Sequence, residues 1–239
     1  MSKIEPTAES AGSGPLHTAA MATRSEMWLP TLLSVIAGMV DLIGFLTLGI
    51  FTAHVTGNIV VVGALIVRHN RVNPAQILAI PVFILAVAVT WLIAAASGRR
   101  GTGLKRQLLL IQFLLITGLL VFSVLTKPSA DPRSLMATIA AMIAVTAMGC
   151  QFALLRLIVP VAPSTAVMTG NLTNAVLALM DSSSNHPLIE GGTRKRTGAL
   201  HLLIGFFVGC VVAAGAVIYF GDWAWSLPAA LAAIAVALR

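Results

Sequence analysis

Apolar residues fall in eight segments that short polar or charged stretches separate. The segments are 28–49, 59–67, 75–97, 108–126, 134–160, 172–180, 198–220 and 223–238. A helix needs about 20 residues, at about 1.5 Å each, to cross the roughly 30 Å of hydrocarbon in a bilayer. Five segments reach that length, while the last one is marginal because it is shorter and contains Pro228. The pattern predicts an all-α bundle of membrane helices.

Segments 59–67 and 172–180 are too short to cross alone. Each has nine uninterrupted apolar residues, or about 14 Å of helix. A Thr-Gly-Asn step precedes each of them. The two steps consist of Thr56, Gly57 and Asn58, and of Thr169, Gly170 and Asn171. We therefore predict two re-entrant segments, each of which descends to the middle of the membrane and returns as a half-helix.

The two steps occupy matching places, because the order long, short, long, long occurs twice along the chain and each step precedes a short segment. This order indicates an internal duplication. We predict a first membrane repeat over 28–133 and a second over 134–239, after a polar tail, 1–27, that we expect to be disordered and cytoplasmic. With six spans and two half-helices, each repeat has three spans, so the two repeats are inverted relative to one another.

Composition supports a membrane protein. Of the 239 residues 58% are hydrophobic and 10% charged, whereas about a quarter of a soluble domain is charged. This excludes a soluble enzyme and a nucleic-acid-binding module, although the net charge is +7, because Lys and Arg collect in the cytoplasmic loops of membrane proteins. Cys150 and Cys210 have no ligand at metal-binding spacing, so we expect packed thiols and neither a metal nor a cofactor.

Basic residues predict the orientation. Six spans put ten Lys and Arg residues on one side and four on the other, which places both termini in the cytoplasm of a bacterial inner membrane. Eight spans give the same ratio, so the ratio does not separate the two topologies. We favour six spans because the short segments cannot cross and because the basic loop 99–106 then stays on the cytoplasmic side.

Asp41 and Arg156 are charged residues inside otherwise apolar segments, and each precedes its Thr-Gly-Asn step by a similar length of chain. A charge in hydrocarbon costs a few kcal/mol unless it finds a partner or water. One hypothesis is an ion pair that joins the repeats. The other is that Arg156 extends to the interface while Asp41 caps broken backbone. Gln151 either belongs to the network of Arg156 or bonds another helix.

The Thr-Gly-Asn steps carry the functional hypothesis. A glycine permits a tight reversal, Thr or Asn caps amides, and a helix start presents unpaired N–H groups with partial positive charge. Two such breaks line the substrate site of many inverted-repeat transporters; the alternative is two hairpins packed dry. His54, two residues before the first step, either titrates near neutral pH or satisfies a carbonyl group.

These observations leave three functions open. The first is a transporter or channel for a small anionic or neutral polar solute, lined by the steps, Asp41 and Arg156. The second is an accessory or scaffold subunit with structural re-entrant loops. An embedded enzyme is disfavoured, because only His54 and Asp41 are candidates for its chemistry. Gly205, Gly209 and Ala213 form a small-residue stripe that packs a helix within the chain or holds a homo-oligomer together.

The runs 38–41, 51–58, 149–151 and 168–172, with Arg156 between the last two, resemble the YoaK-like family of uncharacterised bacterial multi-pass membrane proteins, which carries domain of unknown function 1275. The resemblance covers residues 28–239. It implies a lipid bilayer as the surroundings and an inner-membrane location, and it adds no mechanism.

Overall fold

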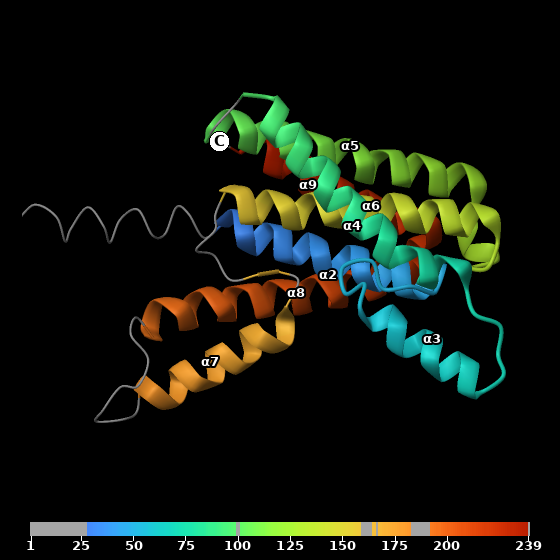
Figure 1. Ribbon diagram of the computed structural model, residues 1–239, viewed down its shortest axis with the longest axis horizontal. Coiled ribbons are helices and arrows are strands. Elements are labelled where there is room, and N and C mark those ends of the chain that lie inside the picture. The colour runs from blue at the N-terminus through green and yellow to red at the C-terminus, as the bar shows by residue number, and fades with distance from the viewer. Residues whose placement is uncertain (1–27, 99–100, 159–163, 166, 183–191, 239) are drawn as a thin grey trace, which may run out of the picture.

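The computed structural model describes residues 28–98, 101–158, 164–165, 167–182 and 192–238, and for 182 and 192–197 the backbone alone. The described chain is helical (Figure 1). Its α-helices are α2 (Trp28–Leu48), α3 (Gly57–Val67), α4 (Pro74–Ala96), α5 (Thr102–Thr126), α6 (Leu135–Ile158), α7 (Met168–Ser182), α8 (Gly192–Phe220) and α9 (Ser226–Ala237). Two 3₁₀ turns, η1 (Pro128–Ala130) and η2 (Gly221–Trp225), precede α6 and α9. The predicted tail, 1–27, lies outside the described residues.

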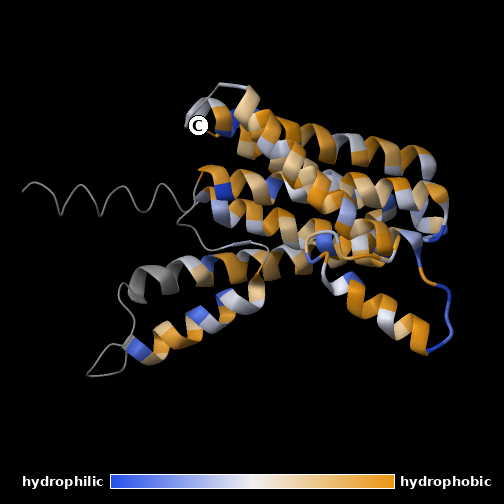
Figure 2. Cartoon of the chain, in the orientation of Figure 1, coloured by the Kyte–Doolittle hydropathy of each residue, from blue (hydrophilic) through white to orange (hydrophobic). Residues whose placement is uncertain are grey.

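Five segments of the described chain are long and apolar enough to cross a membrane. Four of them are α2, α4, α5 and α6, and the fifth, Gly198–Ala237, combines most of α8 with η2 and α9. The helices are largely hydrophobic along their length, whereas the link after α3 is mostly hydrophilic (Figure 2), and many large apolar side chains of α4, α5 and α8 are exposed. The all-helical prediction is confirmed, and the apolar helices indicate a membrane-embedded protein.

Helices α2 and α6 form the core, because most of their residues are buried, whereas a third or less of the residues of α4, α5 and the segment Gly198–Ala237 are buried. The helices pack in matching pairs. Helix α2 packs along α8 as α6 packs along α4, and α5 packs on α6 as α9 packs on α2. Helix α3 lies beside α4 as α7 lies beside α8.

Helices α2 and α8 cross closely. A Cβ atom added at Gly38 would collide with the carbonyl oxygen of Phe206, and one added at Gly209 would collide with that of Val35. Gly205 likewise faces the carbonyl oxygen of Thr31. The glycines of the small-residue stripe therefore pack against α2 of the same chain. These contacts agree with the interpretation that the stripe packs a helix within the chain. A homo-oligomer stays a prediction.

Helices α3 and α7 are shorter than a span. Their 11 and 15 residues correspond to about 16 Å and 22 Å. Figure 1 shows α7 beginning beside α8, and it shows α3 and α7 running toward opposite ends of the bundle. Helix α7 begins at Met168, so the second Thr-Gly-Asn step forms its first turn rather than preceding the helix, as the sequence had suggested.

The end of α2 and the beginning of α4 lie at the same end of the bundle. Asn73 Nδ2 donates to the carbonyl oxygens of Leu48, at 3.1 Å, and Pro132, at 2.9 Å. Gln76 Nε2 donates to the carbonyl oxygen of Gly49 at 3.0 Å. The segment between α2 and α4, which includes α3, therefore leaves and rejoins the bundle at one end.

Candidate functional site

The chain reverses direction directly after α2. Gly49 has a φ of +71°, a left-handed conformation that glycine adopts without a steric penalty. The returning segment lies against Gly44, where an added Cβ atom would sit 2.6 Å from Cγ2 of Thr52. Thr52 reaches Asp41, which is seven residues before Leu48 and so about 10 Å back along the helix.

Asp41 holds the returning segment. Its Oδ1 accepts hydrogen bonds from the backbone N–H groups of Thr52 and Ala53, both at 2.8 Å, and of His54 at 3.3 Å. The carboxylate is buried, with 5% of the residue exposed. Three consecutive amides that converge on one oxygen form an anion-binding concavity, and here the anion is a side chain of the same protein. Asp41 thus satisfies backbone that the break in the helix leaves without partners.

The expected ion pair between Asp41 and Arg156 is wrong. In the part of the chain that the structure describes, the ion pair of Asp41 is with His54, whose Nδ1 lies 2.7 Å from Oδ2. Arg156 is exposed in the last turn of α6, where a cation interacts favourably with the helix dipole. The alternative, that Asp41 caps broken backbone, is confirmed.

His54 pairs with a carboxylate rather than with the carbonyl group that we had expected as its simplest partner. Its side chain is 29% exposed, and its ring meets that of Phe206 edge-on, with centroids 5.1 Å apart. Phe206 lies in α8, so this contact places the first loop beside the middle of that helix.

Both Thr-Gly-Asn steps use their asparagine in the same way. Asn58 Nδ2 donates to the carbonyl oxygen of Phe51 at 2.8 Å, and Asn58 Oδ1 accepts from the N–H of the same residue at 2.9 Å. Asn171 Nδ2 donates to the carbonyl oxygen of Ser164 at 2.7 Å. In each case the partner is seven residues upstream. Both asparagines are buried, while Thr56 and Thr169 are exposed.

The predicted capping of α3 is wrong. Thr56 occupies the N-cap position without a side-chain hydrogen bond to the helix. The N–H groups of residues 57, 58 and 59 donate to the carbonyl oxygens of residues 54, 55 and 56, so these amides are already paired. Gly57 does not have a positive φ either; an added Cβ atom there would meet the ring of Phe51 at 3.1 Å. Glycine is therefore needed for a close approach rather than for a reversal.

Gln151 bonds two other helices, as the second of its two interpretations had it. Its Nε2 donates to the carbonyl oxygen of Leu33 at 2.9 Å, and its Oε1 accepts from Gln112 Nε2 at 2.6 Å. Gln151 and Gln112 are buried. This chain of amides ties α2, α5 and α6 together, and Asp41 and Arg156 are not among the partners of Gln151 that the structure describes.

Residues 29–238 match a family model described as "Protein of unknown function (DUF1275)". The chain belongs to the DUF1275 family. Neither the curated proteins nor the solved structures contain a match. The family description assigns no activity, so the chemistry of this DUF1275 protein has to be argued from its own side chains. Among the described residues no group of three or more His, Cys, Asp or Glu side chains is arranged to hold a metal ion.

Four residues of this DUF1275 protein contribute to the loops and their surroundings without having been predicted from the sequence: Gly44, Thr52, Thr165 and Asn73. A signal existed for the two threonines. Residues 51–58 and 164–171 are identical at five of eight positions, and Thr52 corresponds to Thr165. Thr165 is fully buried, and its hydroxyl has no hydrogen-bond partner in the described structure.

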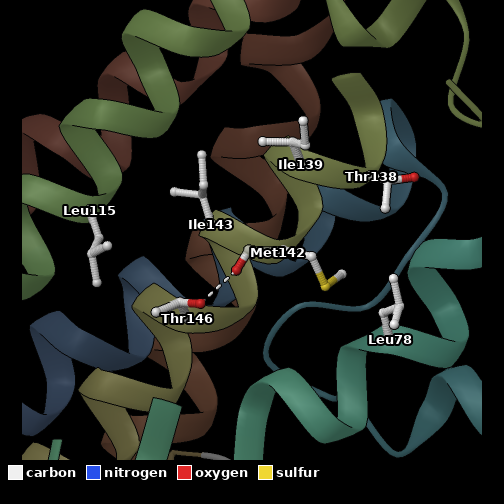
Figure 3. Close-up of a pocket in the computed structure, with 7 residues that line it drawn as sticks. All are labelled: Leu78, Leu115, Thr138, Ile139, Met142, Ile143 and Thr146. Atoms are coloured by element: carbon white, nitrogen blue, oxygen red, sulfur yellow. Dashed lines mark hydrogen bonds between the residues drawn. The ribbon is translucent and has the colours of Figure 1, made fainter. Parts of the chain in front are cut away.

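A groove elsewhere on the bundle is unrelated to these loops. It lies between α4, α5 and α6 (Figure 3). Its lining residues are Leu78, Leu115, Thr138, Ile139, Met142, Ile143 and Thr146. The two threonine hydroxyls donate to backbone carbonyl oxygens one turn earlier in the chain. The groove is consequently apolar in character and contains none of the predicted site residues.

Proposed function

We propose that this DUF1275 protein is a transporter or channel for a small anionic or neutral polar solute. In this proposal α3 and α7 are re-entrant half-helices, and the passage runs between their starting points beside the middle of α8. The observation that carries the proposal is the path of the first loop: the chain returns about 10 Å along α2 to reach Asp41 before α3 begins, and α3 then leads back to the same end of the bundle.

An inverted repeat of three spans each, with the two half-helices, is supported by the matching pairs of helices. An axis that exchanges α2 with α6 also exchanges α3 with α7, α4 with α8 and α5 with α9. The contacts of α2 with α8, of α2 with α9 and of α7 with α8 then correspond to those of α6 with α4, of α6 with α5 and of α3 with α4. Many transporters with inverted repeats place the substrate at the midplane, between half-helices from the two repeats.

The polar groups at the two half-helix starts favour a wet passage over dry packing. Thr56 and Thr169 are exposed at corresponding positions, and His54, two residues before Thr56 on the first loop, is partly exposed. Backbone outside a helix is tolerated at membrane depth only where it is covered by protein or lines a water-filled cavity. We place this protein in a bacterial inner membrane with both termini in the cytoplasm, on the charge bias of its loops.

Accessibility of single cysteines to a membrane-impermeant maleimide tests the passage. In a background with Cys150→Ala and Cys210→Ala, we expect Thr56→Cys and Thr169→Cys to be labelled from the water phase in proteoliposomes. Ile84→Cys is the matched control, because Ile84 is 62% exposed on the apolar face of α4 and should stay unlabelled in lipid. Labelling of both threonine positions no faster than that of Ile84→Cys would refute a wet passage.

An accessory or scaffold subunit is the second candidate. The apolar surface of α3 favours it, because Val60 and Val67 are 74% and 78% exposed and would suit a neighbouring membrane protein. In that case the loops are structural, and Thr56→Cys and Thr169→Cys remain unlabelled. An embedded enzyme is less favoured, since Asp41 engages both of its carboxylate oxygens in holding the loop and His54.

A further inference from the structure

The two repeats differ in the residue that stands at the position of Asp41. In the first, the carboxylate of Asp41 fills the concavity formed by the amides of residues 52–54. The register that aligns Asn58 with Asn171 also aligns residue 52 with residue 165, and it aligns Asp41 with Leu154. Leu154 is buried in α6, and its side chain has no hydrogen-bonding group. The second repeat therefore lacks the internal anion.

The second repeat also has a buried hydroxyl donor, Thr165, at the position that corresponds to Thr52. Thr52 directs its hydroxyl toward Asp41 Oδ1 at 3.5 Å, whereas the hydroxyl of its counterpart Thr165 has no partner in the described structure. Thr165 is fully buried, and a buried hydroxyl without a hydrogen bond costs free energy. An acceptor from outside the protein would remove that cost.

The electrostatics near Thr165 favour an anion. Thr165 is three residues before the start of α7, a helix of 15 residues whose first turn carries partial positive charge. In the first repeat the negative charge of Asp41 lies against the loop that leads to the start of α3. The second start has Leu154 at the equivalent position, so it lacks the negative charge that Asp41 supplies in the first repeat.

We propose that Thr165 and the start of α7 bind the carboxylate group of the transported solute, in the place that Asp41 takes in the first repeat. This inference rests on the proposed function and narrows its solute from anionic or neutral to a small carboxylate. In this site the Thr165 hydroxyl donates to a carboxylate oxygen, and Leu154, which the register aligns with Asp41, supplies no competing charge.

Introducing a carboxylate side chain into the second repeat tests the proposal. Leu154→Asp gives α6 the residue that α2 has, and Leu154→Asn is its uncharged match of nearly the same size. Purified protein in liposomes at pH 8 is assayed for uptake of labelled pyruvate, a small carboxylate, and of labelled erythritol, a neutral solute, against protein-free liposomes. We expect Leu154→Asp to abolish pyruvate uptake and Leu154→Asn to retain more of it.

Thr165→Val is the second variant, because it keeps the shape of threonine and leaves α6 untouched. We expect it to lower pyruvate uptake about ten-fold, because loss of a hydrogen bond to a charged group weakens binding by about ten-fold or more. Thr165→Ser restores the hydroxyl and the uptake. Thr146→Val, whose hydroxyl bonds Met142 within the distant groove, is the control that should behave as the native protein.

The outcomes separate the two proposals. Uptake of erythritol without pyruvate, or pyruvate uptake that neither Leu154→Asp nor Thr165→Val reduces, overturns the carboxylate site and leaves the passage standing. Uptake of neither solute by the native protein counts against the passage itself. Pyruvate uptake that both variants reduce, with recovery in Thr165→Ser, supports the site.

Discussion

The buried carboxylate of Asp41 supports the first loop, so its removal gives a large and specific loss of stability. In Asp41→Ala, the N–H groups of Thr52, Ala53 and His54 lose their acceptor, and His54 loses its ion pair. A buried donor left without a partner costs about 1–3 kcal/mol. Allowing for relaxation of the loop, we expect a loss of about 3–6 kcal/mol, a large part of a typical total stability of about 5–15 kcal/mol.

Asp41→Asn separates hydrogen bonding from charge. The amide oxygen of Asn can still accept from Thr52 and Ala53, but it carries no charge to pair with His54. We expect a smaller loss of about 1–3 kcal/mol, because a hydrogen bond to a charged group is worth more than one to a neutral group.

Equilibrium unfolding by denaturant in detergent micelles measures both losses. Asp131→Asn is the matched control, since Asp131 is exposed in the link before α6 and its replacement should change the unfolding free energy by less than about 0.5 kcal/mol. The reasoning is refuted if Asp41→Ala unfolds within about 1 kcal/mol of the native protein, or if Asp41→Ala and Asp41→Asn lose the same amount.

Three further predictions concern the scaffold around the loops. Gly38→Val should separate α2 from α8, because its side chain meets the carbonyl group of Phe206, and cost about 1–3 kcal/mol in unfolding free energy; a neutral effect contradicts the close crossing. The losses of Gln112→Leu and Gln151→Leu should sum to more than the loss of the double variant, with a coupling energy of about 1–2 kcal/mol in a double-mutant cycle; zero coupling contradicts their hydrogen bond. Gly49→Ala, at a φ of +71°, should cost about 1 kcal/mol, and an unchanged melting temperature would argue against the reversal there.

The long helices were predictable from sequence because burial in lipid requires length and apolar composition alone. Predicted segments 28–49, 75–97 and 134–160 end within two residues of α2, α4 and α6. The predicted segment 108–126 begins six residues after the start of α5, since Thr102 to Gln107 continue the helix as a polar extension that hydropathy does not detect.

The partners of the polar residues were not predictable in the same way. Asp41 and Arg156 look equivalent when their distances to the two steps are compared, yet the register that aligns Asn58 with Asn171 puts Leu154 opposite Asp41. Asp41 pairs with His54 because the returning segment brings that residue within 2.7 Å, a consequence of the turn at Gly49. Such a pairing depends on the path of the loop, which apolar periodicity does not encode.

The most direct test of the account is the side of the membrane on which α3 ends. A single Asn70→Cys, in the link after α3, is labelled with an impermeant maleimide in intact cells and in inverted vesicles, with an amino-terminal tag as the reference for the cytoplasmic side. Because α3 returns to the end of the bundle where α2 ends, the account predicts that Asn70→Cys reacts on the side opposite the tag. Reaction on the same side as the tag would mean that α3 crosses the bilayer, and it would contradict the half-helix on which the passage depends.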